Sequence, residues 1–343
     1  MNQLSAKPGL RSVIASLALL SASTVGAQTF QVATFATGTS VNATGPDSVA
    51  VTKNSLWVSY TNGADSTGLS GSSTIVQYKL KNGTVRHTYS IAGSVDGLKI
   101  DPATGIVWAL QNQDGNSTIT LIDPEDNTVS KPIPYAVKSA TRGSDDVAFR
   151  MDHVFLSYTN PVNPTDPTIL LVHNGSNPVT VTPILLMGAT GTDLATGLSN
   201  QPTSQSDPDS LRLTPYGDLM LSSGANAQLI FVSQPGTSSQ SVSFLNLLDQ
   251  AKKPVADLDD ATFATAHKGT FYLADTGNNR ILKIDAPTLR VGSLYASVSS
   301  LNALVKVDLD TGVVTPIVSD LQGPHGLLFV GRTEKDEEDC QDE

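Results

Sequence analysis

The sequence predicts an all-β fold, a β-propeller of six blades, with seven blades as the alternative. Short alternating or apolar runs bounded by Gly, Asn, Asp, Pro, Ser or Thr recur along the chain, as in Ser55–Tyr60 and Thr74–Tyr78. Such runs are typical of β-strands, and Asn82-Gly83 is a hairpin turn signal between two of them. Helical periodicity is almost absent, and Leu245–Ala251 is the one segment where we expect a short helix.

A repeated phrase supports the propeller. Each copy starts with one polar residue in front of an apolar-x-apolar strand. The residue is an aspartate five times and a histidine once: Asp47, Asp96, Asp145, Asp209, Asp259 and His325. The intervals between copies are 49, 49, 64, 50 and 66 residues. A period of about 50 residues with about four strands per repeat is typical of propeller blades.

Two features of the sequence concern the closure of the ring: the long interval between Asp259 and His325, and a strand before the first repeat. Two further hairpins lie between Asp259 and His325, at Phe271–Asp285 and Leu294–Asp308. They predict either an extra hairpin or a blade that lacks its first strand. The strand Phe30–Ala36 precedes the first repeat. We expect it to pair with C-terminal strands, since closure removes exposed sheet edges.

The chain divides into three predicted segments. Residues 1–27 predict a signal peptide, with Lys7 and Arg11 before the apolar stretch Val13–Leu20 and a small-residue cleavage site at Val25–Ala27. That stretch is too short to span a bilayer, which needs about 20 residues, so we expect no membrane span and a secreted or periplasmic protein. Residues 28–332 are expected to form a single propeller domain, and residues 333–343 an acidic disordered tail.

Charge and missing motifs exclude several classes of function. The formal net charge is −11, and no basic stripe is present, which excludes nucleic acid as a partner. The single cysteine, Cys340, cannot form an intrachain disulfide. The sequence holds no G-x-S-x-G, H-E-x-x-H or P-loop motif. Serine hydrolases, zincins and nucleotide hydrolases are therefore disfavoured, and no organic cofactor is predicted.

Two segments resemble a known group of propellers. Pro324–Leu327, together with Tyr272–Asp275 followed by Asn279–Ile281, resembles the NHL-repeat pattern. More broadly, the chain is similar to the six-bladed group that contains SMP-30/gluconolactonase-like and streptogramin-lyase-like proteins. That resemblance implies a six-bladed fold, and the group includes lactone hydrolases that use a divalent cation, a lyase and many binding modules. The loop Thr44–Asp47 lacks the metal-binding glutamate that SMP-30-like enzymes carry near the first blade.

The six repeated polar residues are the main candidate site. The first strand of a propeller blade is innermost, so these residues are expected to converge on one mouth of the channel. Crowded carboxylates repel one another and take up protons or a cation. Oxygen ligands suit a divalent cation, Ca²⁺ foremost, and an imidazole would also admit Zn²⁺ or Mn²⁺. The predicted metal ligands are Asp47, Asp96, Asp145, Asp209, Asp259 and His325.

The aspartates also have a purely structural interpretation. An aspartate before a strand often accepts a hydrogen bond from the backbone N–H two residues on, which stabilises a turn. Four further acids flank the same loops and are expected on the solvent side: Asp146, Asp207, Asp257 and Asp260. Trp57 and Trp108 occupy equivalent second-strand positions, where packing between blades is expected.

Two classes of function stay open at this point. The first is a divalent-metal-assisted hydrolase or lyase for a small lactone-like or oxygenated substrate, with His325, Asp209 and Asp145 as catalytic residues. The second is a non-enzymatic propeller that binds a protein, a glycan or a surface ligand. Fold alone does not choose between them.

Overall fold

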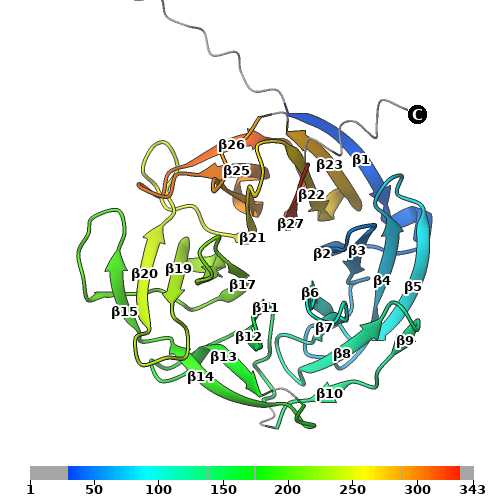
Figure 1. The fold of residues 1–343 in the computed structure, drawn as a ribbon, viewed down its shortest axis with the longest axis horizontal. Helices are drawn as coiled ribbons and strands as arrows, with labels where there is room; N and C mark the ends of the chain where they lie inside the picture. Colours follow the sequence, from blue (N-terminus) through cyan, green and yellow to red (C-terminus); the bar gives the residue numbers. More distant parts are fainter. Residues whose placement is uncertain (1–29, 137–138, 174, 287, 333–343) are drawn as a thin grey trace, which may run out of the picture.

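The computed structural model describes residues 30–136, 139–173, 175–286 and 288–332. These residues form six sheets of four to six strands around a central channel (Figure 1). The prediction of six blades is confirmed, and the alternative of seven is wrong. The predicted signal peptide, residues 1–27, and the predicted acidic tail, residues 333–343, lie outside the described residues. Within the described ranges, no helix has the length and apolar character needed to cross a membrane.

Blades 1 to 3 follow the chain in order, each from the innermost strand outward. Blade 1 consists of β2 (Pro46–Val51), β3 (Ser55–Tyr60), β4 (Ser72–Lys79) and β5 (Val85–Ala92). Blade 2 consists of β6 (Val95–Ile100), β7 (Val107–Gln111) and β8 (Thr118–Asp123), with β9 (Thr128–Val129) and β10 (Ile133–Pro134) at its outer edge. Blade 3 consists of β11 (Val147–Arg150), β12 (His153–Ser157), β13 (Pro167–His173) and β14 (Thr180–Leu186).

Blade 4 carries an addition at its outer edge. Its regular strands are β17 (Pro208–Leu213), β18 (Leu219–Ser223), β19 (Gln228–Ser233) and β20 (Ser241–Asn246). Outside them lie β15 (Thr190–Asp193) and β16 (Gln201–Pro202), and β15 pairs parallel to β20. This addition accounts for the long interval between Asp145 and Asp209.

Blades 5 and 6 are interleaved along the chain. Blade 5 consists of β21 (Leu258–Phe263), β24 (Leu294–Val298), β25 (Ala303–Val307) and β26 (Val314–Val318). Blade 6 consists of β27 (Pro324–Gly331), β22 (Gly269–Asp275), β23 (Arg280–Ala286) and β1 (Gln31–Thr37). The hairpin β22–β23 thus belongs to a blade whose first strand comes later in the chain. Figure 1 shows β1 beside β23, so the predicted closure by the N-terminal strand is confirmed.

The apolar core lies between the blades. Among the described residues there are six buried clusters, and each joins two neighbouring blades. Trp57 is fully buried in the cluster between blades 1 and 2, where it stacks on Tyr89. Trp108 of blade 2 contacts Phe149 of blade 3 edge-on, with ring centroids 5.4 Å apart. The prediction that both tryptophans pack between blades is confirmed.

Helical structure is confined to single turns in the described chain. Four 3₁₀ turns are present, η1 (Gly38–Val41), η2 (Gly224–Asn226), η3 (Thr276–Asn278) and η4 (Ser299–Leu301). The short helix expected over Leu245–Ala251 is wrong. Leu245 is a fully buried residue of β20, where it pairs with Leu229 of β19. Its apolar side chain serves the core between blades 4 and 5, so pairing with the sheet prevails over the weak helical pattern.

Candidate functional site

An extra residue is inserted into most of the innermost strands at the repeated polar position. In β2, Pro46 pairs with Tyr60 and Val49 pairs with Val58, so three steps along one strand oppose two along the other. The same β-bulge occurs in β6, β17, β21 and β27. Bulges re-aim side chains and are common beside functional sites. Here they direct two successive residues toward the channel mouth.

These residues enclose a small polar cavity of about 20 Å³, room for about one water molecule or ion. Its lining is almost entirely acidic and polar: Asp47, Ser48, Asp96, Lys99, Asp145, Asp146, Asp209, Ser210, Asp259, Asp260 and Gly326. The structure thus brings the five predicted aspartates together. It also places His325 against two of them, as described next.

His325 lies between two carboxylates of the ring. Its Nδ1 atom is 2.8 Å from Asp47 Oδ1 and 3.3 Å from Asp259 Oδ1. One ligand atom from each of these three residues lies within 4.8 Å of the others. Two oxygens bound to one Ca²⁺ at about 2.4 Å each would be separated by at most about 4.8 Å. The spacing and the donor types therefore fit a shared divalent cation.

The ring alters the protonation of its own members. Burial, followed by the carboxylate of Asp259, raises the pKa of Asp145 well above its usual value. Burial and the neighbouring Asp145 do the same to the pKa of Asp209. Burial raises the pKa of Asp259 to about 7, although His325 opposes this shift. The Asp259 carboxylate is the main cause that raises the pKa of His325 to about 10.

Backbone groups at the bulges have partners other than the ring carboxylates. In blades 1, 3 and 5, the N–H of the second bulge residue donates to a serine hydroxyl on the neighbouring strand. These serines are Ser59 (3.0 Å), Ser157 (2.8 Å) and Ser297 (3.1 Å). The sequence analysis missed them, although a serine near the end of each second strand was the available signal.

The five ring aspartates do not make the hydrogen bonds that would define turn caps. Asp47 and Asp259 contact His325, and Asp96 accepts a hydrogen bond from Gln113 Nε2 at 3.1 Å. Within the described chain, none of the five accepts a hydrogen bond from a backbone N–H. Their oxygens are therefore left for one another, for the imidazole and for a ligand.

Capping falls instead to the second acids of the bulges. Asp146 and Asp260 were expected on the solvent side, and this expectation is wrong, because they are only 6% and 5% exposed. The Asp146 carboxylate accepts hydrogen bonds from the N–H groups of Val147 (2.8 Å) and Leu211 (2.9 Å). For Asp260 the bulge in β21 is the physical reason, since it turns both successive side chains inward, whereas Asp146 lies in the loop that leads into β11. Asp257 is exposed and Asp207 half-buried, closer to the expectation.

Two half-buried cations, Lys99 and Arg212, compensate these second acids. Lys99 Nζ lies 3.0 Å from Asp146 Oδ2, and one Arg212 Nη atom lies 2.9 Å from each oxygen of Asp260. Burial opposes ionisation of Asp260, but Arg212 and then Lys99 outweigh it and hold the pKa of Asp260 well below its usual range. Neither cation was predicted as part of the site.

Arg212 and Asp260 together hold the strand that carries the histidine. The same Arg212 nitrogen donates to the carbonyl oxygen of Leu327 at 2.9 Å, and the N–H of Leu327 donates to Asp260 Oδ2 at 3.0 Å. Both backbone polar groups of Leu327, two residues after His325 in β27, are thus hydrogen-bonded by these side chains. We call these three residues the β27 clamp, and they connect blades 4, 5 and 6.

The balance of charge at the mouth is negative. Seven aspartates surround the cavity, and the cations among them and beside them are Lys99, Arg212 and His325. Such a mouth attracts cations and disfavours anionic ligands that arrive without one. Carboxylate oxygens are a donor set that suits Ca²⁺, and loss of the His325 proton would add an imidazole that admits transition metals.

Comparison with known proteins supports the fold. No family model matches the sequence, and no curated protein is similar to it. Among solved structures, virginiamycin B lyase from Staphylococcus aureus is similar with a TM-score of 0.50 at 13% identity, over 89% of this chain and 94% of that one. A structure provisionally named a gluconolactonase gives a TM-score of 0.52 at 9% identity, over 85% and 83% of the two chains. The predicted resemblance to six-bladed propellers of these groups is confirmed as a likeness of fold.

Proposed function

We propose that the channel mouth is the active site of a divalent-cation-assisted hydrolase or lyase that acts on a small lactone-like or oxygenated substrate. The observation that carries this proposal is the meeting of Asp47, Asp259 and His325 within 4.8 Å, beside a cavity lined by the other ring aspartates. The carboxylates of the five ring aspartates accept no hydrogen bond from a backbone N–H group in the described chain. A cation at this position would neutralise carboxylates that otherwise repel one another.

The residues of the mouth divide into two roles. Asp47, Asp96, Asp145, Asp209 and Asp259 supply the oxygen ligands. A divalent cation bound there would polarise a substrate carbonyl or activate a water molecule. His325 is held through Nδ1 by Asp47, so its Nε2 atom is the one left to move a proton to or from the substrate. The side chain of His325 is 36% exposed, which leaves it accessible from the mouth.

The names of similar structures agree with this class of chemistry. One of them is a lyase and another is provisionally named a gluconolactonase. At 13% and 9% identity these likenesses support a propeller scaffold of this kind and not a particular substrate. The absence of a basic surface stripe and the acidic mouth favour neutral polar substrates. On the strength of residues 1–27 we also propose that the protein acts outside the cytoplasm.

Cation binding is tested first, separately from catalysis. The protein is stripped with a chelator, and Ca²⁺, Mg²⁺, Mn²⁺ and Zn²⁺ are titrated by calorimetry. We expect one high-affinity ion per chain, lost in the double variant Asp47→Asn/Asp259→Asn. The matched control is Asp310→Asn, an exposed turn residue remote from the ring. Equal binding by the control and the double variant would refute a metal site at the ring.

Catalysis is then measured with a panel of lactones and small esters, using proton release as the readout. We expect turnover that depends on the bound ion and falls by at least a hundredfold in His325→Gln. That variant should still bind the ion, because the carboxylates remain. If the ring binds no ion and the panel shows no turnover, the protein is a binding propeller for a protein or a glycan, the second class of function.

A further inference from the structure

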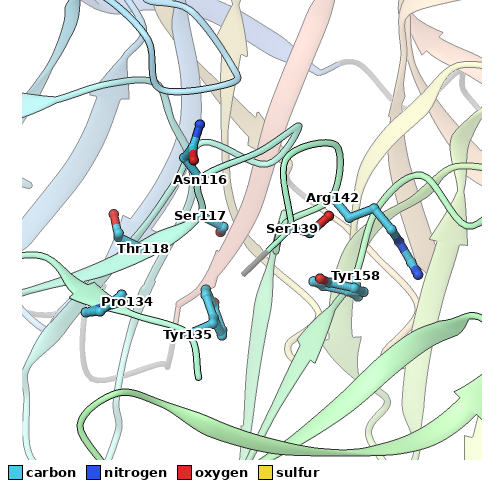
Figure 2. Close-up of a pocket in the computed structure, with 8 residues that line it drawn as sticks. All are labelled: Asn116, Ser117, Thr118, Pro134, Tyr135, Ser139, Arg142 and Tyr158. Atoms are coloured by element: carbon cyan, nitrogen blue, oxygen red, sulfur yellow. The ribbon is translucent and has the colours of Figure 1, made fainter. Parts of the chain in front are cut away.

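A second and larger cavity lies between blades 2 and 3, away from the acidic ring. Its volume is about 100 Å³, and its wall includes no carboxylate. The lining residues come from the start of β8, the end of β10, the loop before β11 and the end of β12. They are Asn116, Ser117, Thr118, Pro134, Tyr135, Ser139, Arg142 and Tyr158 (Figure 2).

Tyr135 forms the inner wall of this cavity and is firmly placed. It makes an isolated parallel bridge with Val179, in which Val179 N–H donates to Pro134 O and Ala136 N–H donates to Val179 O, each at 2.8 Å. Its side chain is only 6% exposed. The backbone of blade 3 therefore fixes a residue that follows the last strand of blade 2.

The hydroxyl of Tyr135 lies beside the hydroxyls of Ser117 and Ser144, without a well-formed hydrogen bond to either. Among the described residues, no group is in hydrogen-bonding geometry with this buried oxygen, and the fully buried hydroxyl of Ser144 is in the same condition. A buried polar group without a partner carries the cost of its lost hydration. The Tyr135 hydroxyl, on the cavity wall, would gain from a molecule there that offers an oxygen atom.

The opposite wall is Tyr158, and Arg142 holds it. The Arg142 guanidinium lies 4.5 Å from the centroid of the Tyr158 ring. Its nitrogens donate to the carbonyl oxygens of Thr159 (2.9 Å) and Pro167 (2.6 Å), and Asp166 lies 3.7 Å away. The charge of Arg142 is therefore matched by the protein itself. The cavity offers a ligand hydroxyl groups and aromatic faces, with little net charge.

Serine hydroxyls complete the polar lining. In the view of Figure 2, Ser117 and Ser139 lie above Tyr135 and Tyr158. The Ser117 hydroxyl donates to Gln111 O at 3.0 Å and accepts from Ser144 N–H at 3.3 Å, so it is held in place. The Ser139 oxygen accepts the N–H of Thr141 at 3.3 Å, and its hydroxyl lies beside that of Tyr158.

We propose that this cavity is a binding site for a small uncharged polyol, a molecule with neighbouring hydroxyl groups on about three carbons. A volume of about 100 Å³ corresponds to about three water molecules, and three linked hydroxyls would replace them. Hydroxyls both donate and accept, which suits the Tyr135 hydroxyl on the cavity wall. The carbon chain of such a molecule would lie between the two tyrosine rings. This site is separate from the acidic ring and does not depend on the proposed catalysis.

Saturation-transfer NMR on the full mature chain tests the site, with ethylene glycol, glycerol, erythritol and sucrose as probes. We expect glycerol and erythritol to bind and sucrose, which is too large, to give no signal. Tyr135→Phe removes one hydroxyl and should weaken glycerol binding about tenfold, the effect of one hydrogen bond. The matched control is Tyr89→Phe, whose hydroxyl contacts Asn127 Oδ1 at 2.8 Å on the outer side of blade 1 and should leave binding unchanged.

The stability of the two variants supplies an independent readout. Tyr135→Phe removes a buried hydroxyl that makes no well-formed hydrogen bond, so its melting temperature without polyol should stay close to that of the wild type. Tyr89→Phe loses a hydrogen bond and should melt lower. Equal glycerol binding by the wild type and Tyr135→Phe would overturn the proposal. So would the absence of any polyol signal, which would mean that water alone fills the cavity.

Discussion

Loss of the Arg212 side chain should destabilise this protein more than loss of any exposed ion pair. In Arg212→Met the carboxylate of Asp260 stays buried at 5% exposure without its main counter-ion, and Lys99 Nζ at 4.0 Å is a weak substitute. Breaking a buried ion pair from one side costs about 3–5 kcal/mol. The carbonyl of Leu327 also loses a hydrogen bond. For a domain of this size, about 2 °C per kcal/mol gives a melting temperature about 6–10 °C lower.

Differential scanning calorimetry in a chelating buffer measures this shift, with Arg332→Met as the control. The Arg332 side chain is 42% exposed and contacts Asp285 at the surface, so its loss should cost less than about 1 kcal/mol. Adding Asp260→Asn to Arg212→Met removes the orphaned charge and should recover part of the loss. A difference of 2 °C corresponds to about 1 kcal/mol. If Arg212→Met melts within 2 °C of the control, the β27 clamp contributes far less to stability than expected.

Three further predictions concern the ring and the closure. Without divalent cations, we expect stability to fall as the pH rises from 5 to 8, because the raised pKa of Asp259, about 7, means that the folded state holds a proton which the unfolded chain has lost. Asp259 alone should contribute about 3 kcal/mol in denaturant titrations, the raised pKa values of His325, Asp145 and Asp209 add to the fall in the same direction, and a flat profile would contradict the prediction. Gly326→Ala should cost about 1–3 kcal/mol by chemical denaturation, since a Cβ atom there would lie 2.3 Å from the carbonyl oxygen of Asp47; wild-type stability would show that the strands can separate freely. Deletion of β1 should expose the edge of β23 and cause aggregation in light-scattering assays, whereas a monomeric, wild-type-like product would show that closure does not need this strand.

The sequence repeats predicted most of the fold. A polar residue followed by an apolar-x-apolar strand recurs at a period that suits one blade, and this local pattern needs no knowledge of distant contacts. The position of the ring followed from the same pattern, because equivalent residues of equivalent strands must meet around the axis. The repeats did not predict that the hairpin β22–β23 belongs to blade 6 and not to blade 5. Both hairpins in that interval have similar sequences, and only contacts across the blades decide which sheet each one joins.

The inward direction of the second acids was also beyond local reasoning. Simple alternation along a strand places Asp146 and Asp260 opposite to their ring neighbours, but Asp260 lies in the bulge of β21 and Asp146 in the loop before β11. The partners of these acids were predictable in part, because Lys99 and Arg212 each stand between two apolar residues at the end of an innermost strand. A lone cation in such a strand signals a buried counter-charge. The sequence does not say which acid it meets, since the partners lie 47 or more positions away.

The sequence by itself determined that the protein is a six-bladed propeller with five aspartates and a histidine at one mouth. Periodic local patterns suffice for this, because each blade repeats the same strand and turn preferences. Tertiary structure alone decided which residues at the channel mouth pair with one another. It assigned His325 to Asp47 and Asp259, gave backbone capping to Asp146 and Asp260, and left an uncapped ring that a cation could join. Those pairings depend on distances between blades, and no local sequence pattern encodes them.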